Sequence, residues 1–342
     1  MSRPSRRSAV SGLAETLDRL ITLELPQNWG RSPASRPASR GVTPDGVGQL
    51  YGAARRRLGW PLADGAAAAF LSRTRPGDRL IFTTGLVAPG IPRGETDGPA
   101  GAVALARAMI LGRRVAVFLV TEAEAVPVLE GAADALAASE RDRGRWQKHL
   151  KVLAFPSDPE SALDGAHRLW KDLRPAALVS VEKLGPNARG IIHNMAGQNV
   201  TASQARSDVF FPLAEGARTL TVGIGDRGNE IGLGGLLPRP GRCACPCGGS
   251  FACVVRAEIP VVATSSNWGA YAVTAALATR LKDRRLLHRP GSEARMLRRM
   301  VRAGAVDGIT RRRAPTVDGL DLALQTALVG MLGALVGPGR RG

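Results

Sequence analysis

The chain has 342 residues, of which 44% are apolar, and a net charge of +18 with a pI of about 11.3. This length and composition exclude a globally disordered chain and allow one large domain or two ordinary ones. No apolar run approaches the roughly 18 to 20 residues that a membrane span needs, so we expect no membrane partner. The basic N-terminus lacks the apolar segment of a signal peptide, and we expect a cytoplasmic protein.

The positive charge by itself would suggest a nucleic-acid partner. However, only five of the 47 basic residues are lysines, and the arginines are scattered along the chain in short runs. Aromatic residues make up 4% of the chain, which leaves few platforms for base stacking. Because GC-rich coding explains the arginines at least as well as binding does, we do not expect a nucleic-acid partner. A basic nucleic-acid-associated protein without catalysis remains an alternative.

The N-terminal part of the chain is predicted to be helical with irregular connections. Residues 1–10 are predicted to form a disordered basic tail, and 11–25 a helix with Ser11 as its N-cap. A stretch rich in proline and glycine over 26–46 is expected to be irregular. Two further helices are predicted over 48–58 and 62–73.

From residue 79 onwards, short apolar runs alternate with helical patterns. Strands are expected over 79–84, 114–120, 151–155, 176–181 and 219–223, and over 253–263 as one or two strands broken near Pro260. Helices are expected over 99–111, 122–143, 158–173, 266–281, 293–303 and 320–335. The alternation predicts an α/β fold, with a mainly parallel sheet flanked by helices on both faces. We expect a single large domain over 11–336, followed by a flexible basic tail over 337–342.

Polar side chains follow several of the predicted strands, and ligands of parallel sheets bind in such loops. Glu95 and Asp97 follow the first strand; alternatively, Asp97 or Thr96 caps the next helix and Glu95 is solvated. The pair Glu182-Lys183 follows the strand at 176–181, and its alternative is a surface ion pair. Lys183 could form a Schiff base, but nothing nearby identifies a pyridoxal phosphate site.

The stretch from Thr219 to Gly235 combines a β-prone run with a glycine-rich loop that carries Asp226, Asn229 and Glu230. Its Gly-x-Gly-x-x-Gly spacing fits a dinucleotide fingerprint. No helical pattern follows, and no acidic residue occurs between Glu230 and Glu258, so we reject this interpretation and expect no NAD. The carboxylates could instead hold a hard cation or move a proton.

Two further segments carry polar groups. Ser266 and Asn267 open the helix over 266–281, where they would cap it or help its N–H groups bind a carboxylate. His193 and Asn194 belong to an amide-rich segment over 192–199. His193 could act as an acid or a base, although a lone histidine is more often structural.

All four cysteines lie within eleven residues, at Cys243, Cys245, Cys247 and Cys253, which is not a disulfide framework. The C-x-C-x-C spacing is tighter than the usual C-x2-C of a zinc knuckle. We predict reduced thiols in a loop, with adventitious zinc or a redox pair as alternatives.

Four segments in this order resemble the D-glutamate cyclase C-terminal domain family. They are Gly94-Glu-Thr-Asp-Gly-Pro-Ala-Gly101, the turn at Val181-Glu182, Gly225-Asp-Arg-Gly-Asn-Glu-Ile-Gly232 and Ser266-Asn-Trp-Gly-Ala270. The resemblance runs from roughly residue 10 to 335. The family has glycine where Arg227 stands and commonly arginine where Lys183 stands. Residues 187–199 are only loosely similar, and the cysteines are particular to this chain.

The resemblance implies a lyase that converts D-glutamate to 5-oxo-D-proline and water, with this amino acid as its small-molecule partner; a homo-oligomer is one option. A divalent cation, Mg²⁺ or Mn²⁺, would polarise the γ-carboxyl group. Its expected ligands come from Glu95, Asp97, Glu182, Asp226 and Glu230. Glu230 or Glu182 would be the base, and Asp226 is the third catalytic candidate. The expected substrate-binding residues are Asn229, Asn267, Ser266, Gly225, Gly228 and Asn194. A metal-dependent hydrolase or lyase acting on another small amino or carboxylic acid is the alternative.

Overall fold

A computed structural model describes residues 6–25, 46–139, 145–237, 243 and 245–337. Within them, six strands form one sheet in the order β3-β2-β1-β4-β5-β6. The strands are β1 (Arg79–Thr84), β2 (Ala116–Thr121), β3 (Leu150–Ala154), β4 (Ala177–Val181), β5 (Leu220–Gly225) and β6 (Ile259–Val262). All five neighbouring pairs are parallel, which confirms the predicted class of fold.

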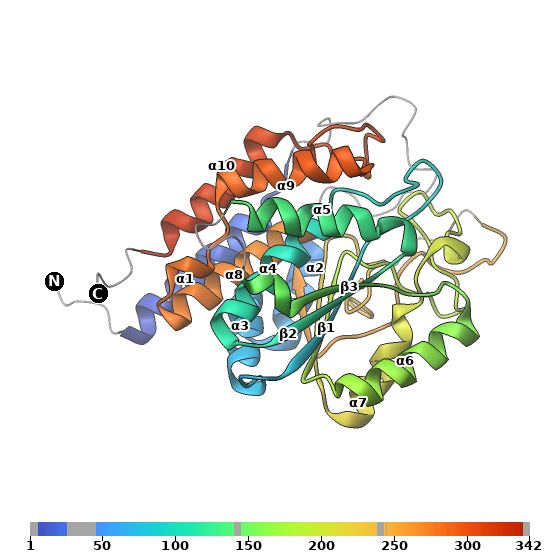
Figure 1. The fold of residues 1–342 in the computed structure, drawn as a ribbon, viewed down its shortest axis with the longest axis horizontal. Coiled ribbons are helices and arrows are strands. Elements are labelled where there is room, and N and C mark those ends of the chain that lie inside the picture. Colours follow the sequence, from blue (N-terminus) through green and yellow to red (C-terminus); the bar gives the residue numbers. More distant parts are fainter. Residues whose placement is uncertain (1–5, 26–45, 140–144, 238–242, 244, 338–342) are drawn as a thin grey trace.

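Helices cover both faces of the sheet, unequally (Figure 1). One face carries α6 (Pro159–Leu173) and α7 (Phe210–Ala217), which pack on a smaller core that contains Ile81. The other face carries the main core, to which the neighbouring β1 residues Leu80 and Phe82 belong. Its helices are α1 (Arg6–Ile21), α2 (Gly46–Leu58), α3 (Leu62–Arg73), α4 (Pro99–Arg113), α5 (Val126–Ala137), α8 (Ser266–Leu281), α9 (Pro290–Ala303) and α10 (Leu322–Leu335). The alternation within β1 is what a strand buried on both faces requires.

Most predicted elements are observed with small shifts at their ends, but four predictions need correction. The helix expected over 122–143 begins at Val126, after a 3₁₀ turn at Ala123–Ala125, because Pro127 fits only the first turn of a helix. It ends at Ala137, and residues 140–144 lie outside the described part. In the predicted strand region over 253–263, only Ile259–Val262 is a strand; it is an edge strand, where Pro260 is tolerated.

The first helix begins at Arg6, so the assignment of Ser11 as its N-cap is wrong, and the helix enters the predicted tail. Its end at Ile21 is fixed by the β6–α8 connection, because the Ile21 carbonyl accepts a hydrogen bond from Thr264 N (2.7 Å). The predicted irregular stretch over 26–45, the first five residues and the tail beyond residue 337 lie outside the described part. Helix α7 was not predicted, since Pro212 and Gly216 obscure its eight-residue pattern.

The strand order places a switch point between β1 and β4. From β1 the chain builds outwards through β2 and β3, and then returns to build β4, β5 and β6 on the other side. The loops that follow β1 and β4 therefore diverge at the carboxyl edge of the sheet, which is where ligands of such folds bind. This edge also carries the loops after β5 and β6.

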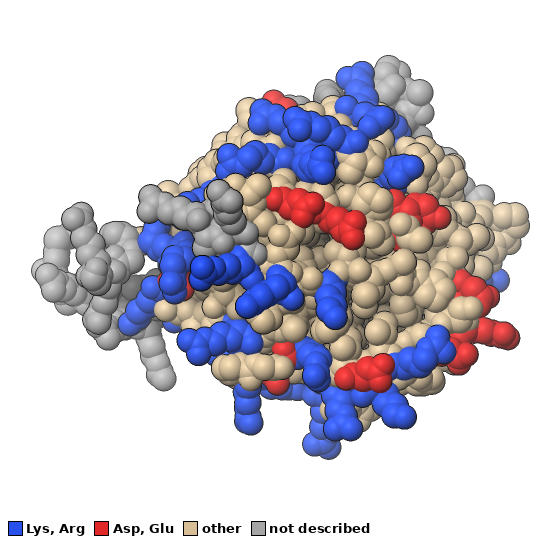
Figure 2. Space-filling view, in the orientation of Figure 1, with Lys and Arg blue, Asp and Glu red and all other residues tan. Residues whose placement is uncertain are grey.

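The outer surface gives two further observations. In the described part of the chain, no helix combines the length and the apolar character that a membrane crossing requires. On the face shown in Figure 2, lysine and arginine side chains are spread widely, with aspartate and glutamate between them.

Candidate active site

Six carboxylates meet at the carboxyl edge of the sheet. They are Glu95 and Asp97 after β1, Glu182 after β4, Asp226 and Glu230 after β5, and Asp318 from the segment between α9 and α10. We call these six residues the acidic cluster. Oxygens of Asp97, Asp226 and Asp318 lie within 4.8 Å of one another, as do oxygens of Glu182, Asp226 and Glu230. Asp226 belongs to both groups, which places it at the centre.

Asp97 connects the loop after β1 to helix α8. Its carboxylate accepts hydrogen bonds from the Ser265 hydroxyl (2.8 Å) and from the backbone N–H groups of Ser266 (2.9 Å) and Asn267 (2.8 Å). It also accepts one from Gly98 N (3.0 Å). It therefore satisfies the free N–H groups at the start of α8, as a capping residue does. The alternative in which Asp97 or Thr96 caps the following helix is wrong, because the N-cap of α4 is Gly98, which has no side chain. Glu95 is also buried rather than solvated.

Asn267 makes the reciprocal connection, from α8 to the start of α4. Its Oδ1 accepts hydrogen bonds from Gly98 N (3.0 Å) and Gly101 N (2.7 Å), and its Nδ2 donates to Thr96 O (3.0 Å). Its side chain is thus committed to the protein, so any contribution of Asn267 to substrate binding is indirect. Gly98 is needed at this junction, because a Cβ there would lie 2.7 Å from the Glu182 Cβ, and its φ is 90°.

Glu182 sits at the switch point with an unusual backbone. Its φ is 48°, a left-handed conformation that costs a non-glycine residue about 1–2 kcal/mol. The geometry is held by Glu182 N, which donates to Ile224 O (3.0 Å), and by the Ser266 hydroxyl, which donates to Glu182 Oε2. Such stored strain is a common feature of functional positions.

Lys183 points away from this site. Its ammonium group is fully buried, forms an ion pair with Glu122 and donates a hydrogen bond to Gly85 O (3.1 Å). The alternative of a surface ion pair between Glu182 and Lys183 is therefore wrong. Successive residues after a strand point to opposite sides. Glu182 therefore lies in the acidic cluster, whereas Lys183 is part of the protein interior.

Glu230 turns back onto its own loop. Its two carboxylate oxygens accept hydrogen bonds from the backbone N–H groups of Asp226 (3.1 Å), Arg227 (2.8 Å) and Gly228 (2.6 Å). The carboxylate thus fills the concave turn that these three N–H groups form. A Cβ at Gly225 would lie 2.9 Å from this carboxylate, so the absence of a side chain at Gly225 makes room for Glu230. Gly228 has a φ of 90° and packs against Leu237. Both glycines therefore shape the loop.

Arg227 provides a positive charge at the mouth of the cluster. Its Nε donates to Asp226 Oδ2 at 2.9 Å, and its side chain is 30% exposed. The remaining guanidinium N–H groups can meet an anionic ligand while the pair with Asp226 persists.

The cluster carries more negative charge than its own groups balance. Burial raises the pKa of Glu95, Glu182, Asp226 and Asp318 well above the ordinary range, and repulsion between neighbouring carboxylates adds to the effect. The pKa of Asp97 is raised mainly by burial, against the lowering effect of its hydrogen bonds. Glu95 Oε1 and Asp318 Oδ2 are buried without a hydrogen-bond partner among the described residues. Buried, unpartnered carboxylate oxygens are what a hard divalent cation requires, so this donor set fits Mg²⁺ or Mn²⁺.

Asp318 was not predicted, and its position depends on the loop between α9 and α10, which lies beside the loop after β1. Within that loop, Asp307 accepts hydrogen bonds from Thr310 N (2.7 Å), the Thr316 hydroxyl (2.7 Å) and Gly319 N (2.8 Å). The loop is joined to the β1 loop by Thr96 N, which donates to Val306 O (3.0 Å). The Asp-Gly pair at 318–319 signals a turn, but nothing in the sequence indicates that this turn returns to the acidic loops.

Two predicted amides lie in neighbouring turns. Asn194 accepts hydrogen bonds from Ala196 N (3.1 Å) and Gln198 N (3.0 Å), so its side chain stabilises its own turn. Asn229 donates from Nδ2 to His193 O (2.9 Å) and thereby joins the loop after β5 to the loop after β4. The Asn229 Oδ1 is buried without a hydrogen-bond partner in the described part, so it is the one predicted amide with a free acceptor.

The sequence of the chain matches known proteins. A match to human D-glutamate cyclase, mitochondrial, extends over 195 residues at 30% identity, which is 54% of this chain and 30% of the human protein. The chain thus spans less than a third of the length of that relative. The profile of the family described as "D-glutamate cyclase-like, C-terminal" matches residues 58–333, which include all six carboxylates of the acidic cluster. The chain belongs to the D-glutamate cyclase-like, C-terminal family.

Proposed function

We propose that the acidic cluster is the active site of a lyase that cyclises D-glutamate to 5-oxo-D-proline with release of water. The observation that carries this proposal is the convergence of six carboxylates, five of them buried and Asp318 half-buried, at the β1/β4 switch point of a domain from this family. The name of the human relative suggests the substrate, but the chain covers only 30% of that protein. The reaction is therefore argued from the site.

The chemistry sets two requirements. The α-amino nitrogen forms a bond to the carbon of the γ-carboxyl group, one carbon–oxygen bond of that group breaks, and its oxygen leaves as water with two protons from the ammonium group. The amine is an ammonium near neutral pH, so a base must take its proton. The γ-carboxylate repels a nucleophile, so its charge must be neutralised. Both requirements can be met by a site that combines a carboxylate with a compensating cation.

Two groups of three residues have cation-binding geometry: Asp97, Asp226 and Asp318, and Glu182, Asp226 and Glu230. When bound there, Mg²⁺ or Mn²⁺ would supply electrostatic polarisation of the substrate γ-carboxyl group. Asp97 offers limited capacity, because its oxygens already accept four hydrogen bonds. Asp226 and Asp318 are therefore the principal ligands of this proposal.

Glu182 is the proposed base. Its raised pKa suits a group that must take up a proton near neutral pH, since catalytic groups work best when their pKa lies close to the working pH. The Ser266 hydroxyl holds one oxygen of Glu182 and leaves the other for the substrate ammonium. The same carboxyl can then give a proton to the departing oxygen. Of the two bases predicted from sequence, Glu230 is the weaker candidate, because its oxygens are occupied by the backbone of its own loop.

Arg227 is proposed to receive a substrate carboxylate. D-glutamate carries two carboxylates, and the acidic cluster would repel both without a positive group at its entrance. Holding the substrate chain in its folded conformer between Arg227 and Glu182 would supply part of the acceleration, because ring closure is intramolecular.

The experiment is a turnover assay on purified protein with D-glutamate and L-glutamate, each with EDTA, with Mg²⁺ and with Mn²⁺. We expect 5-oxo-D-proline from D-glutamate only, and only with a divalent cation. Absence of 5-oxoproline under every metal condition, from protein that is shown to be folded, would remove the assignment. Equal turnover in EDTA would remove the cation from it.

A further inference from the structure

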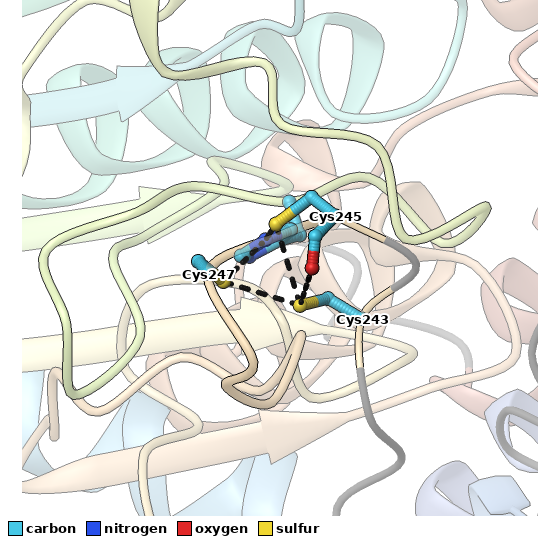
Figure 3. Close-up of side chains that lie close together, drawn as sticks. Cys243, Cys245 and Cys247 are labelled. Carbon is cyan, nitrogen blue, oxygen red and sulfur yellow. Dashed lines mark hydrogen bonds between the residues drawn. The ribbon is translucent and has the colours of Figure 1, made fainter.

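Three cysteine sulfurs and one imidazole nitrogen lie close together in the loops after β4 and β5. Cys243, Cys245 and Cys247 from the loop after β5 point towards one another (Figure 3). His193, from the loop after β4, brings its Nε2 to 3.1 Å from Cys245 Sγ and 3.6 Å from Cys247 Sγ. We call these four residues the thiol cluster. One ligand atom from each lies within 4.8 Å of all the others.

The spacing of these atoms fits the edges of a tetrahedron. Zinc holds sulfur at about 2.3 Å and imidazole nitrogen at about 2.0 Å, so a tetrahedral site has edges of about 3.5–3.8 Å. Cys243 Sγ lies 3.4 Å from Cys245 Sγ and 3.2 Å from Cys247 Sγ. These separations are slightly shorter than tetrahedral edges and far longer than the roughly 2.05 Å of a disulfide bond. All four atoms therefore lie close enough together to bind a single ion.

We propose that the thiol cluster binds one Zn²⁺ ion with four protein ligands, Cys243, Cys245, Cys247 and His193. A set of three thiolates and one imidazole is a closed structural site, because no coordination position is left for water or substrate. Thiolate ligands select zinc over Mg²⁺, which the neighbouring acidic cluster favours. The site does not depend on the proposed enzymatic function.

The C-x-C-x-C spacing is tighter than that of a zinc knuckle, but the fold allows these cysteines to bind zinc in another way. The fourth ligand comes from a different loop, so the cysteines need not supply two separated pairs. Gly248, with a φ of 63°, turns the chain directly after Cys247. Cys243 N donates to Gly249 O (3.0 Å), which closes the cysteine segment into a compact loop.

Zinc at this point would clamp two loops that both carry active-site carboxylates. His193 O accepts the hydrogen bond from Asn229, and Asn229 directly precedes Glu230. A second connection runs from Asn187 Nδ2 to Ser250 O (2.7 Å). Backbone hydrogen bonds already join the inner parts of the two loops, from Gly185 N to Asn229 O (3.0 Å) and from Ile231 N to Lys183 O (2.7 Å). A metal cross-link would extend this connection to the outer parts of the loops.

The test begins with wild-type protein purified without chelators or a metal-affinity step. We expect about one zinc per chain by elemental analysis. Replacement with Co²⁺ should give the visible absorption of a tetrahedral thiolate complex, a readout that needs no variant. Cys245→Ser and His193→Gln should lower the bound zinc well below one per chain.

Cys253→Ala is the matched control. Cys253 is buried outside the thiol cluster, where its sulfur accepts a hydrogen bond from Val255 N (3.3 Å). This variant also loses one cysteine, but it should keep its zinc.

Three results would overturn the proposal. The first is zinc-free protein that takes up no zinc on titration and presents three freely reactive thiols. The second is a native mass lower by two hydrogens, which would show a disulfide within the cluster. The third is zinc that persists equally in Cys245→Ser and His193→Gln, which would place the ion elsewhere, for example in the acidic cluster.

Discussion

The acidic cluster and the thiol cluster both take side chains from the loops after β4 and β5, but at different distances from the sheet. Glu182 and Asp226 are the first residues after β4 and β5, where the strand ends fix the backbone. His193 and the cysteines lie further along these loops, beyond the hydrogen-bonded frame of the sheet. The strand ends fix the positions of Glu182 and Asp226, whereas the proposed zinc ion would cross-link the outer parts of the two loops. The comparison predicts two cation sites with opposite preferences, one hard and one soft.

The largest effect should come from the scaffold that both clusters share. Lys183→Met removes the partner of buried Glu122 and leaves a carboxylate unpaired in the interior. We expect the free energy of unfolding in urea to fall by about 3–5 kcal/mol. Lys183→Met combined with Glu122→Leu should recover much of this loss, because replacing both charges removes the unpaired one. A loss below about 1 kcal/mol for the single variant would mean that the pair does not support the loop.

The next variant should affect the acidic cluster and leave the thiol cluster unchanged. Asp226→Asn weakens the central ligand of the acidic cluster, so we expect D-glutamate turnover to fall at least about 100-fold. Zinc content and thermal stability should stay close to wild type. The matched control is Asp64→Asn on α3, which removes a carboxylate that pairs with Arg280 at the surface. Unchanged turnover in Asp226→Asn, or an equal loss in Asp64→Asn, would break the assignment.

The pH dependence of stability should be specific to the acidic cluster. A carboxyl group whose pKa is raised by folding holds its proton more tightly in the folded state than in the unfolded one. Its stabilising effect is complete below the ordinary values of 3.8 and 4.5 and is lost as pH rises through the raised pKa. Without Mg²⁺ or Mn²⁺, the melting temperature should therefore fall by about 2 °C or more between pH 5 and pH 8.

Divalent cations provide the control for this pH effect. Added Mg²⁺ or Mn²⁺ should restore the melting temperature more strongly at about pH 8 than at about pH 5, because protons compete with the cation for the carboxylates. A melting temperature that rises with pH in the metal-free protein, or a cation effect that does not depend on pH, would contradict the account.

The smallest effect should come from a site that touches neither cluster. Asp158 caps α6 on the opposite face of the sheet, where its carboxylate accepts a hydrogen bond from Ser161 N (2.8 Å). Asp158→Ala should lower the free energy of unfolding only slightly and leave turnover and zinc content unchanged. A change in either would show that the two sites respond to general stability.

The fold could be predicted from sequence because its signals are local. The helices at 62–73 and 266–281 and the strand at 79–84 are observed with the predicted bounds, since their apolar periods and their ends are marked by neighbouring residues. Ligands bind at the carboxyl ends of parallel strands, and this rule correctly predicted that Glu182 and Asp226 lie close together.

What sequence could not supply were contacts made across the fold. Asp318 joins the acidic cluster through a loop between α9 and α10, which is far in sequence from the end of any strand. His193 meets the cysteines through the pairing of two loops, which no spacing within either loop reveals. The sequence leaves the role of Glu230 open for a different reason. Its distance in sequence from Asp226 fits a pair of ligands as well as a carboxylate that binds the backbone of its own loop.

The central claim is that the acidic cluster holds a divalent cation at the place where D-glutamate cyclises. The most direct measurement is a crystal structure of protein soaked with Mn²⁺ and D-glutamate, with the anomalous signal used to place manganese. The account predicts manganese bound to Asp226 and Asp318, with a substrate carboxylate near Arg227 and the amino group near Glu182. Manganese found only at the thiol cluster, or D-glutamate bound away from the acidic cluster, would contradict it.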